Sequence, residues 1–325
     1  MTRRSEFDLI AALFAPLSDE AHGLNLKDDA ARIRPDPGHD LIVTTDALVA
    51  GVHFFPDDSP ADIARKALRV NLSDVAAKGA VPRFYLLALA LPNSIDDAWL
   101  EAFAAGLAAD REAYGVILIG GDTVATPGPL TLAVTAFGQV RQGMALHRGA
   151  AQRDDRIFVT GSIGDAALGL QVRRGGLDLL PVAARDALLR RYLLPDPRTT
   201  VGPRLVALAH AAMDVSDGLV GDLGHICRAS GLGAEIRADL VPRSSAAHQA
   251  LELDPAGLEA MLTGGDDYEI LFTAPADRAP ALAEIAAETG VRITEIGRMA
   301  PGDRVTVWGA DRHPMRFEST GHRHF

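Results

Sequence analysis

Strand and helix patterns begin twice along this chain, and a polar, glycine-containing stretch from 141 to 156 separates the two runs. The first run contains the buried-strand signal Leu41-Ile42-Val43, and the second restarts with Ile157-Phe158-Val159-Thr160. Strands mixed with helices in both halves favour α/β (α+β layered) packing in each. A chain of 325 residues can bury the cores of two such domains. We therefore predict an N-terminal domain over 1–145 and a C-terminal α/β domain over 146–325.

Short acidic segments recur through both halves, with small or hydroxyl-bearing residues beside most of the carboxylates. We expect the first five to end in an acidic residue where a strand or loop gives way to a turn, and the sixth comes later in the chain. One lies on a helical pattern from 61 to 77, whose spacing places Asn71 and Asp74 on the same face. The six segments are Lys27-Asp28-Asp29, Thr44-Thr45-Asp46, Asn71-Leu72-Ser73-Asp74, Gly120-Gly121-Asp122, Asp214-Val215-Ser216-Asp217-Gly218 and Gly264-Gly265-Asp266-Asp267-Tyr268-Glu269.

Each acidic segment alone has an ordinary structural explanation, because Asp favours turns and caps helix N-termini. Six of them in one chain indicate more than capping. Carboxylates and hydroxyls are oxygen ligands of Mg²⁺, and adjacent glycines let backbone N–H groups approach phosphate oxygens. The chain has no G-x-x-x-x-G-K-[ST] loop and no protein-kinase H-R-D or D-F-G set. The pattern therefore predicts a metal-based site for phosphorylated ligands.

Composition argues against several other classes of protein. The formal net charge of −11 leaves no basic surplus for binding nucleic acid. The single cysteine, Cys227, shares helical spacing with Leu223 and Ile226, which predicts core packing. One cysteine forms no intrachain disulfide, so we expect a cytoplasmic protein. No apolar run reaches about 18 residues, and the sequence therefore predicts no membrane span.

Several motifs, spread in order along the chain, resemble those of the thiamine-monophosphate kinase family. The wider superfamily is similar to aminoimidazole-ribonucleotide synthetase. The likeness extends over nearly the whole chain, and the T-T-D…G-x-H-F and N-L-S-D elements are its most specific parts. The motifs are Thr44-Thr45-Asp46-Ala47-Leu48-Val49-Ala50-Gly51-Val52-His53-Phe54, Asn71-Leu72-Ser73-Asp74-Val75-Ala76-Ala77, Ile119-Gly120-Gly121-Asp122-Thr123, Asp214-Val215-Ser216-Asp217-Gly218-Leu219, Gly264-Gly265-Asp266-Asp267-Tyr268-Glu269 and His324-Phe325.

The resemblance implies an ATP- and Mg²⁺-dependent phosphorylation of thiamine monophosphate to thiamine diphosphate, by direct in-line transfer. It also implies a two-domain fold that dimerises through its N-terminal sheet. Several Mg²⁺ ions would be held by Asp29, Thr44, Thr45, Asp46, Asp74, Asp122, Asp214 and Asp217. ATP, the co-substrate, would contact Gly121, Asp122, His147, Arg148 and Ser216. The thiamine phosphate would contact His53, Asp266 and the position of Ser319.

No catalytic base is expected in such a site. A phosphate monoester has a second pKa of about 6, so the phosphate oxygen that accepts the phosphoryl group is already ionised at neutral pH. Transfer then depends on positioning two anions and neutralising their charge.

The chain departs from the family pattern at a few positions. Lys27 stands where a glycine usually precedes the paired aspartates, and Val124-Ala125 replaces a Thr-Arg pair. Asp266 replaces a glutamate, and Ser319 replaces an aromatic residue. The carboxylates of the implied metal set are all present.

Two other functions remain open from the sequence. One is a superfamily relative, either an ATP-dependent cyclo-ligase or a selenophosphate-type synthetase, although the latter would need a reactive cysteine early in the chain. The other is a nucleotide- and magnesium-binding protein that has lost transfer activity. Transfer of a phosphoryl group to thiamine monophosphate would distinguish all three.

Overall fold

The chain divides into two compact units in a computed structural model, which describes residues 4–317 and 321. The first unit comprises Met1–Val75 and Ala80–Gly143. The second comprises Ala76–Gly79 and Met144–Phe325. Each unit contains its own sheet and helices, so the expected α/β layering with two sheets is confirmed.

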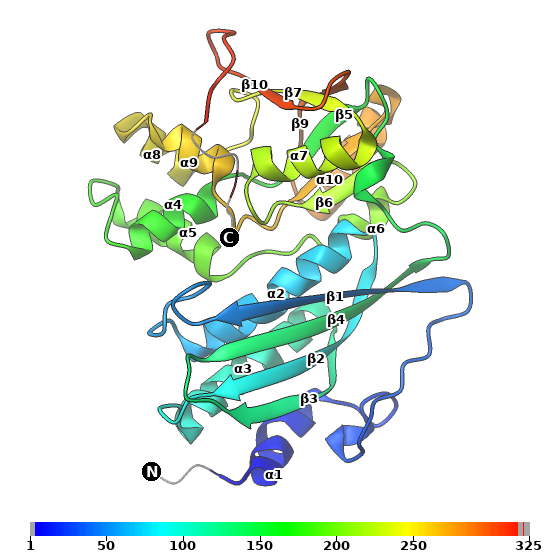
Figure 1. The fold of residues 1–325 in the computed structure, drawn as a ribbon, viewed down its shortest axis with the longest axis vertical. Helices are drawn as coiled ribbons and strands as arrows, with labels where there is room; N and C mark the ends of the chain where they lie inside the picture. The colour runs from blue at the N-terminus through cyan, green and yellow to red at the C-terminus, as the bar shows by residue number, and fades with distance from the viewer. Residues whose placement is uncertain (1–3, 318–320, 322–325) are drawn as a thin grey trace. The chain divides into compact units, whose positions relative to one another are not determined.

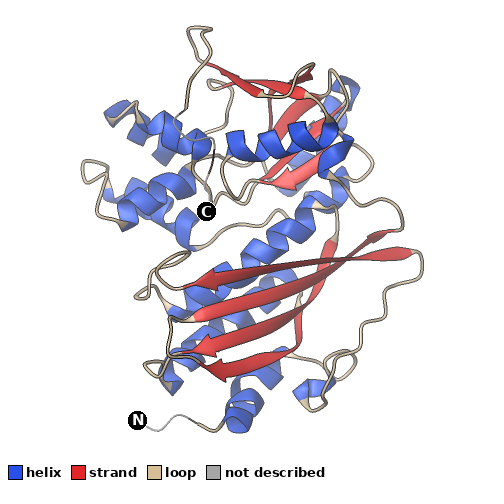
Figure 2. Ribbon diagram, viewed as in Figure 1, coloured by secondary structure: helices blue, strands red, loops and turns tan. Residues whose placement is uncertain are grey.

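The first unit is a four-stranded sheet with helices on one face, as Figures 1 and 2 show. The strand order is β1-β4-β2-β3, in which β4 is antiparallel to both neighbours and β2 is parallel to β3. In the part of the chain that the structure describes, four short helical segments come before the sheet, namely α1 (Glu6–Leu9), η1 (Ile10–Phe14), η2 (Ala15–Leu17) and η3 (Leu24–Leu26). The strands are β1 (His39–Val49), β2 (Val81–Leu91), β3 (Ile117–Ala125) and β4 (Thr131–Arg141), and the covering helices are α2 (Pro60–Ala77) and α3 (Asp97–Tyr114).

Alternation along the strands explains why only one face of this sheet carries helices. In β4, Leu132, Val134 and Ala136 are fully buried, whereas the residues between them are partly exposed. Successive side chains point to opposite faces, so the buried set faces α2 and α3. Helix α3 is delimited by its own caps: the Asp96 side chain accepts from the Trp99 N–H, and Gly115 adopts a left-handed φ of 67°.

The second unit is built on a six-stranded sheet of order β10-β7-β9-β5-β8-β6. All of its pairs are antiparallel except β10 with β7. The strands are β5 (Arg156–Thr160), β6 (Ala211–Asp214), β7 (Gly233–Arg237), β8 (Ile270–Ala274), β9 (Ile293–Ala300) and β10 (Val305–Trp308). The helices are α4 (Asp165–Arg173), α5 (Val182–Leu193), α6 (Gly202–Leu205), α7 (Leu219–Ser230), α8 (Ser245–Leu253), α9 (Gly257–Thr263) and α10 (Ala279–Thr289).

Both faces of the second sheet are buried. In β5, Ile157 and Val159 belong to the core that includes α7, while Phe158 belongs to the core that includes α10. Phe158 stacks on Phe272 of β8 with ring centroids 5.3 Å apart. A sheet covered on both faces gives strands that are mostly apolar, and every residue of β8 is buried.

A bilayer-crossing helix would need both length and apolar composition, and no helix within residues 4–317 has the two together.

Candidate functional site

The Thr44-Thr45-Asp46 segment lies within β1, not at its end. The strand continues to Val49 because its alternation of partly exposed and exposed residues fits a sheet with one open face. Thr44 Oγ1 donates a 2.6 Å hydrogen bond to Asp74 Oδ2 on α2, and the Asp46 N–H donates to Asn71 Oδ1 at 3.1 Å. The structure thus brings two of the acidic segments, far apart in sequence, onto one strand–helix contact.

Asn71 fixes this contact from the helix side. Its side chain is fully buried, and its Nδ2 donates to the Ala67 carbonyl at 3.0 Å while its Oδ1 accepts from Asp46. With the amide satisfied on both sides, Asp74 one turn later is held beside Thr44. The predicted i, i+3 relation of Asn71 and Asp74 therefore places both toward β1.

Thr45 lies on the opposite face of β1 from Thr44. Its Oγ1 donates to the Val134 carbonyl at 3.1 Å and accepts from Thr135 Oγ1 at 3.0 Å. The structure does not bring its hydroxyl together with Asp46 and Asp74.

His53 follows β1 in a turn and folds its ring back onto the strand. The Val49 N–H donates to His53 Nδ1 at 3.0 Å. Nδ1 must then be the unprotonated nitrogen, so the neutral ring carries its proton on Nε2. His53 is therefore an N–H donor through Nε2, which is the form suited to a phosphate oxygen.

Gly120-Gly121-Asp122 also lies inside a strand, β3, and not in a turn after it. A Cβ at Gly121 would sit 1.8 Å from the Leu87 carbonyl oxygen, so only glycine permits this strand pairing. Asp122 pairs with the exposed Ala88, whereas Asp46 pairs with the buried Val134. The two carboxylates consequently point to opposite faces of the sheet, three strands or roughly 14 Å apart.

The Lys27-Asp28-Asp29 segment is an exposed loop after a short 3₁₀ turn, η3 (Leu24–Leu26). Asp28 Oδ1 accepts from the N–H of the next residue, Asp29, at 2.8 Å, which is a bond within the loop. The Asp29 carboxylate is exposed to solvent. The structure does not link this loop to Asp46 or Asp74 by any hydrogen bond described for it.

In the second unit, the two remaining acidic segments form one structure. The Asp266 N–H donates to the Ser216 carbonyl, and the Tyr268 N–H donates to the Val215 carbonyl, both at 2.8 Å. Asp266 adopts a left-handed φ of 71°, and its Oδ1 accepts from the Tyr268 hydroxyl at 3.2 Å. Aspartate tolerates this conformation better than most residues. Asp214, Ser216, Asp217 and Asp266 are therefore brought together along paired loops.

Asp222, which lies outside every predicted motif, organises the first of these loops. Its Oδ2 accepts the backbone N–H groups of Ser216, Asp217 and Gly218 at 3.0, 3.0 and 3.2 Å. Burial raises the pKa of the Asp222 carboxyl to about 7, and the nearby Asp217 charge adds to the rise, whereas the three N–H groups lower it. An acidic residue inside the apolar pattern that follows Gly218 was the available signal.

Two residues at the end of the last acidic segment, Asp267 and Glu269, stabilise the fold. Glu269 is fully buried and accepts from Arg191 Nη2 at 2.8 Å, Arg198 Nε at 2.6 Å and Thr160 Oγ1 at 2.7 Å. Asp267 caps the start of α4 by accepting from the Gly164 N–H at 2.8 Å. Burial raises the pKa of Asp267 well above its ordinary value, against the lowering effect of that N–H group.

The last predicted ATP contacts lie at the start of the second unit. His147 and Arg148 are both exposed, and the His147 carbonyl accepts from the Ala212 N–H at 3.2 Å. This bond holds the segment beside β6, which ends at Asp214. Ser319 and the closing His324-Phe325 lie outside the described residues.

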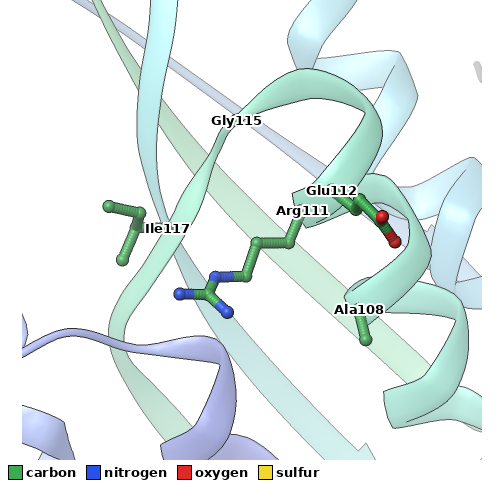
Figure 3. Close-up of a pocket in the computed structure, with 5 residues that line it drawn as sticks. All are labelled: Ala108, Arg111, Glu112, Gly115 and Ile117. Carbon is green, nitrogen blue, oxygen red and sulfur yellow. The ribbon is translucent and has the colours of Figure 1, made fainter.

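A pocket of about 490 Å³ lies at the junction of α3 and β3 and contains none of the predicted site residues. Its lining residues are Ala108, Arg111, Glu112, Gly115 and Ile117. Figure 3 shows Arg111 extending from the helix toward the strand that carries Ile117. Arg111 Nη1 donates to the Pro16 carbonyl at 3.2 Å, so this arginine anchors the N-terminal segment.

The donor chemistry of the first group suits a hard cation. Thr44, Asp46 and Asp74 present hydroxyl and carboxylate oxygens on one strand–helix contact, and Mg²⁺ prefers oxygen ligands. Within residues 4–317, no three His, Cys, Asp or Glu side chains are already gathered at metal-binding distance. Mg²⁺ commonly retains several waters and shares ligands with substrate phosphates, so a fully assembled protein cage is not required.

Two family models match the chain in succession. The N-terminal domain of AIR synthase related proteins matches residues 27–140, and the C-terminal domain matches 152–309. The thiamine-monophosphate kinase of Caulobacter vibrioides is 42% identical over 318 residues, covering 96% of this chain and 89% of its own length. The chain belongs to the thiamine-monophosphate kinase family. The resemblance found in its motifs is confirmed.

Solved structures of the family have the same fold. The thiamine-monophosphate kinase from Stenotrophomonas maltophilia K279a superposes with a TM-score of 0.84 at 45% identity, over 93% of this chain and 96% of that one. AaThiL complexed with AMPPCP and TMP superposes with a TM-score of 0.79 at 31% identity, over 100% and 99% of the two chains.

Proposed function

We propose that this chain phosphorylates thiamine monophosphate to thiamine diphosphate, with ATP as the phosphoryl donor. The observation that carries the proposal is its similarity, over 100% of its length, to a family member complexed with AMPPCP and TMP. AMPPCP is an ATP analogue whose β–γ bridge is a methylene group, so it stands for unreacted ATP. The activity supplies thiamine diphosphate in thiamine biosynthesis.

We assign Mg²⁺ binding to the oxygen-bearing residues of the acidic segments. The contact of Thr44 and Asp46 with the Asp74 helix supports this assignment for the first unit, and the loop from Asp214 to Asp217 supports it for the second. When bound, Mg²⁺ neutralises phosphate charge during transfer. The proposed ligands are Asp29, Thr44, Asp46, Asp74, Asp122, Asp214 and Asp217. Thr45 is left out because its hydroxyl lies on the other face of β1, bonded to Val134 and Thr135.

The chain's own side chains then bind and orient the two anions. His53 donates from Nε2 to the thiamine phosphate, because its Nδ1 already accepts from Val49. Asp266 binds on the substrate side, held by its bond from Tyr268. No side chain needs to remove a proton, since the acceptor phosphate is ionised at neutral pH. Ser319 is the third proposed substrate contact.

In this proposal, the nucleotide is bound by Gly121, Asp122, His147, Arg148 and Ser216. The exposed guanidinium of Arg148 and the partly exposed hydroxyl of Ser216 are suited to phosphate oxygens. Residues 1–145 would then carry metal, nucleotide and dimer contacts, and 146–325 would form the C-terminal domain. A cytoplasmic location fits an enzyme that uses ATP.

We also propose a homodimer that forms through the open face of the first sheet. Val43 on β1 and Val124 on β3 are 53% and 48% exposed, and both lie on outer strands of that sheet. Apolar side chains on an otherwise uncovered sheet face are typical of an interface. Analytical ultracentrifugation should give a dimer, and Val43→Lys together with Val124→Lys should shift it to a monomer.

The function is tested by incubating the purified protein with ATP, Mg²⁺ and thiamine monophosphate and separating the products. Thiamine diphosphate and ADP should appear in equal amounts, and unphosphorylated thiamine should be a poor acceptor. Nucleotide binding without thiamine diphosphate would instead identify a binding protein that lacks transfer activity.

A further inference from the structure

We propose that Asp222 is a positioning residue for the nucleotide site. Its carboxylate fills the anion-binding turn formed by Ser216, Asp217 and Gly218, so that this loop offers its side chains to the ligand instead of its backbone. The identity of the ligand, a magnesium-bound nucleoside triphosphate, rests on the proposed function.

The geometry at Asp222 is that of an occupied anion site. Three consecutive backbone N–H groups converge on a single oxygen, Asp222 Oδ2, at 3.0, 3.0 and 3.2 Å. Consecutive N–H groups that converge in this way form the nests that bind phosphate oxygens in other proteins. Here the chain supplies the anion itself, from a side chain that is only 1% exposed. A ligand phosphate could use these donors only by expelling a buried carboxylate.

The loop is fixed on its other side by the 264–269 segment. The Ser216 carbonyl accepts from the Asp266 N–H at 2.8 Å. A Cβ at Gly265 would lie 2.1 Å from that same carbonyl oxygen, and a Cβ at Gly218, whose φ is 118°, would lie 2.4 Å from the Thr263 oxygen. Two backbones packed this closely leave the loop one conformation.

The bonds to Asp222 and the packing against the 264–269 segment determine which groups of the 216–218 loop face the ligand. Its N–H groups point inward to Asp222, while the side chains of Ser216 and Asp217 remain partly exposed. Removing the Asp222 charge weakens the bonds to the three donors and allows the loop to reorient. The Ser216 hydroxyl and the Asp217 carboxylate would then lose their fixed positions.

Asp155 provides a matched control in the same unit. It is 4% exposed, and its Oδ2 accepts from the Gln152 N–H at 2.8 Å and from Thr273 Oγ1 at 3.1 Å and lies 2.9 Å from His210 Nδ1. It belongs to none of the proposed binding sets. A buried carboxylate with only structural partners should affect stability alone, and Asp155→Asn measures that effect.

The variants Asp222→Asn and Asp155→Asn should be compared with wild type by melting temperature, by the KM for ATP and by the Mg²⁺ concentration for half-maximal activity. Both should melt at a lower temperature. Asp222→Asn should raise the KM for ATP about tenfold or more, a change of about 1.4 kcal/mol, while Asp155→Asn leaves it unchanged. A KM for ATP in folded Asp222→Asn equal to that of wild type would overturn the proposal.

Amide hydrogen exchange on the wild-type protein tests the same point without a variant. The N–H groups of 216–218 should exchange slowly in the free protein, and Mg²⁺ with a non-hydrolysable ATP analogue should not slow them further. Fast exchange that becomes slow when the analogue binds would mean that these groups bind the nucleotide, and would overturn the proposal. If wild type forms no thiamine diphosphate, the proposed function fails, whereas the exchange result still decides the role of Asp222.

Discussion

Two groups of carboxylates in this protein differ in what surrounds their oxygen atoms. Asp110 and Glu269 are 0% exposed, and each forms ion pairs with two arginines from other parts of the chain. Asp46, Asp74 and Asp122 lie partly or fully exposed on β1, α2 and β3. Acidic residues at conspicuous sequence positions therefore have two distinct uses. The donors around each carboxylate, and not its sequence neighbours, tell them apart.

The physical basis of the difference is the cost of burying a charge. A buried carboxylate must be paired and hydrogen-bonded, and Asp110 accepts from Arg69 Nε and Nη2 at 2.7 and 2.8 Å and from Arg65 Nε at 3.0 Å. Its oxygens are committed to joining α2 and α3. Asp74 accepts one hydroxyl bond at 2.6 Å from Thr44 and keeps access to solvent, so its carboxylate can still bind a metal ion.

The largest expected effect is on stability, from Asp110→Asn. Asparagine removes the charge that pairs with Arg69, which is only 9% exposed, and this should lower the free energy of unfolding by about 3–5 kcal/mol. Urea denaturation measures the loss. The Mg²⁺ dependence of activity should stay unchanged at temperatures where the variant is folded. A stability equal to that of wild type would remove Asp110 from the structural group.

Asp46→Asn should have the opposite profile. Asparagine keeps the side-chain shape and the backbone bond to Asn71, so the unfolding free energy should change little. Loss of a ligand charge should lower kcat/KM on the order of a hundredfold, the scale seen when one transition-state contact is removed. Steady-state formation of thiamine diphosphate measures this. Normal turnover in the variant would exclude Asp46 from the metal set.

Asp267→Asn tests a buried carboxyl group through the pH dependence of folding stability. Burial raises the native pKa of Asp267 above its ordinary value of 3.8, so the native state retains a proton that the unfolded chain releases. Its contribution to stability is complete below pH 3.8 and declines as the pH rises toward the native pKa. Asparagine does not titrate.

The stability of Asp267→Asn relative to wild type should therefore improve as the pH rises from about 4 to 8, by about 1.4 kcal/mol per unit of native pKa elevation. Thermal unfolding across that pH range measures the difference. A constant difference at every pH would show that Asp267 titrates as it does in the unfolded chain.

The smallest expected effect separates the two threonines of β1. Thr44→Val removes the 2.6 Å bond to Asp74 and should cost about 1 kcal/mol of stability while raising the Mg²⁺ requirement. Thr45→Val removes bonds to Val134 and Thr135 on the other face and should leave the Mg²⁺ requirement at its wild-type value. Equal shifts in both variants would argue against a metal site on the α2 side of β1.

Local patterns predicted the parts of this structure that depend on local spacing. The helix containing Asn71 and Asp74 was predicted from 61 to 77 and is found from Pro60 to Ala77. The placement of Thr44-Thr45-Asp46 and Gly120-Gly121-Asp122 at strand ends was wrong. Both lie within strands, because polar and small residues on either face interrupt the apolar alternation by which a strand is recognised.

Long-range pairing could not be predicted from the sequence. The bond between Thr44 and Asp74 depends on β1 packing against α2, and the pairing of Ser216 with Asp266 joins positions 50 residues apart. Asp222 was missed for a different reason, since its partners lie only four to six residues before it in the sequence. Its partners form a turn whose shape appears only when the chain folds back on itself.

The most direct test is the Mg²⁺ activation curve of thiamine diphosphate formation for wild type, Asp46→Asn and Asp110→Asn, measured together with their unfolding free energies. We expect Asp46→Asn to lose activity at every Mg²⁺ concentration while remaining as stable as wild type. We expect Asp110→Asn to lose stability while keeping the wild-type activation curve. Loss of both properties in both variants would contradict the division of the carboxylates into a metal-binding group and a structural group.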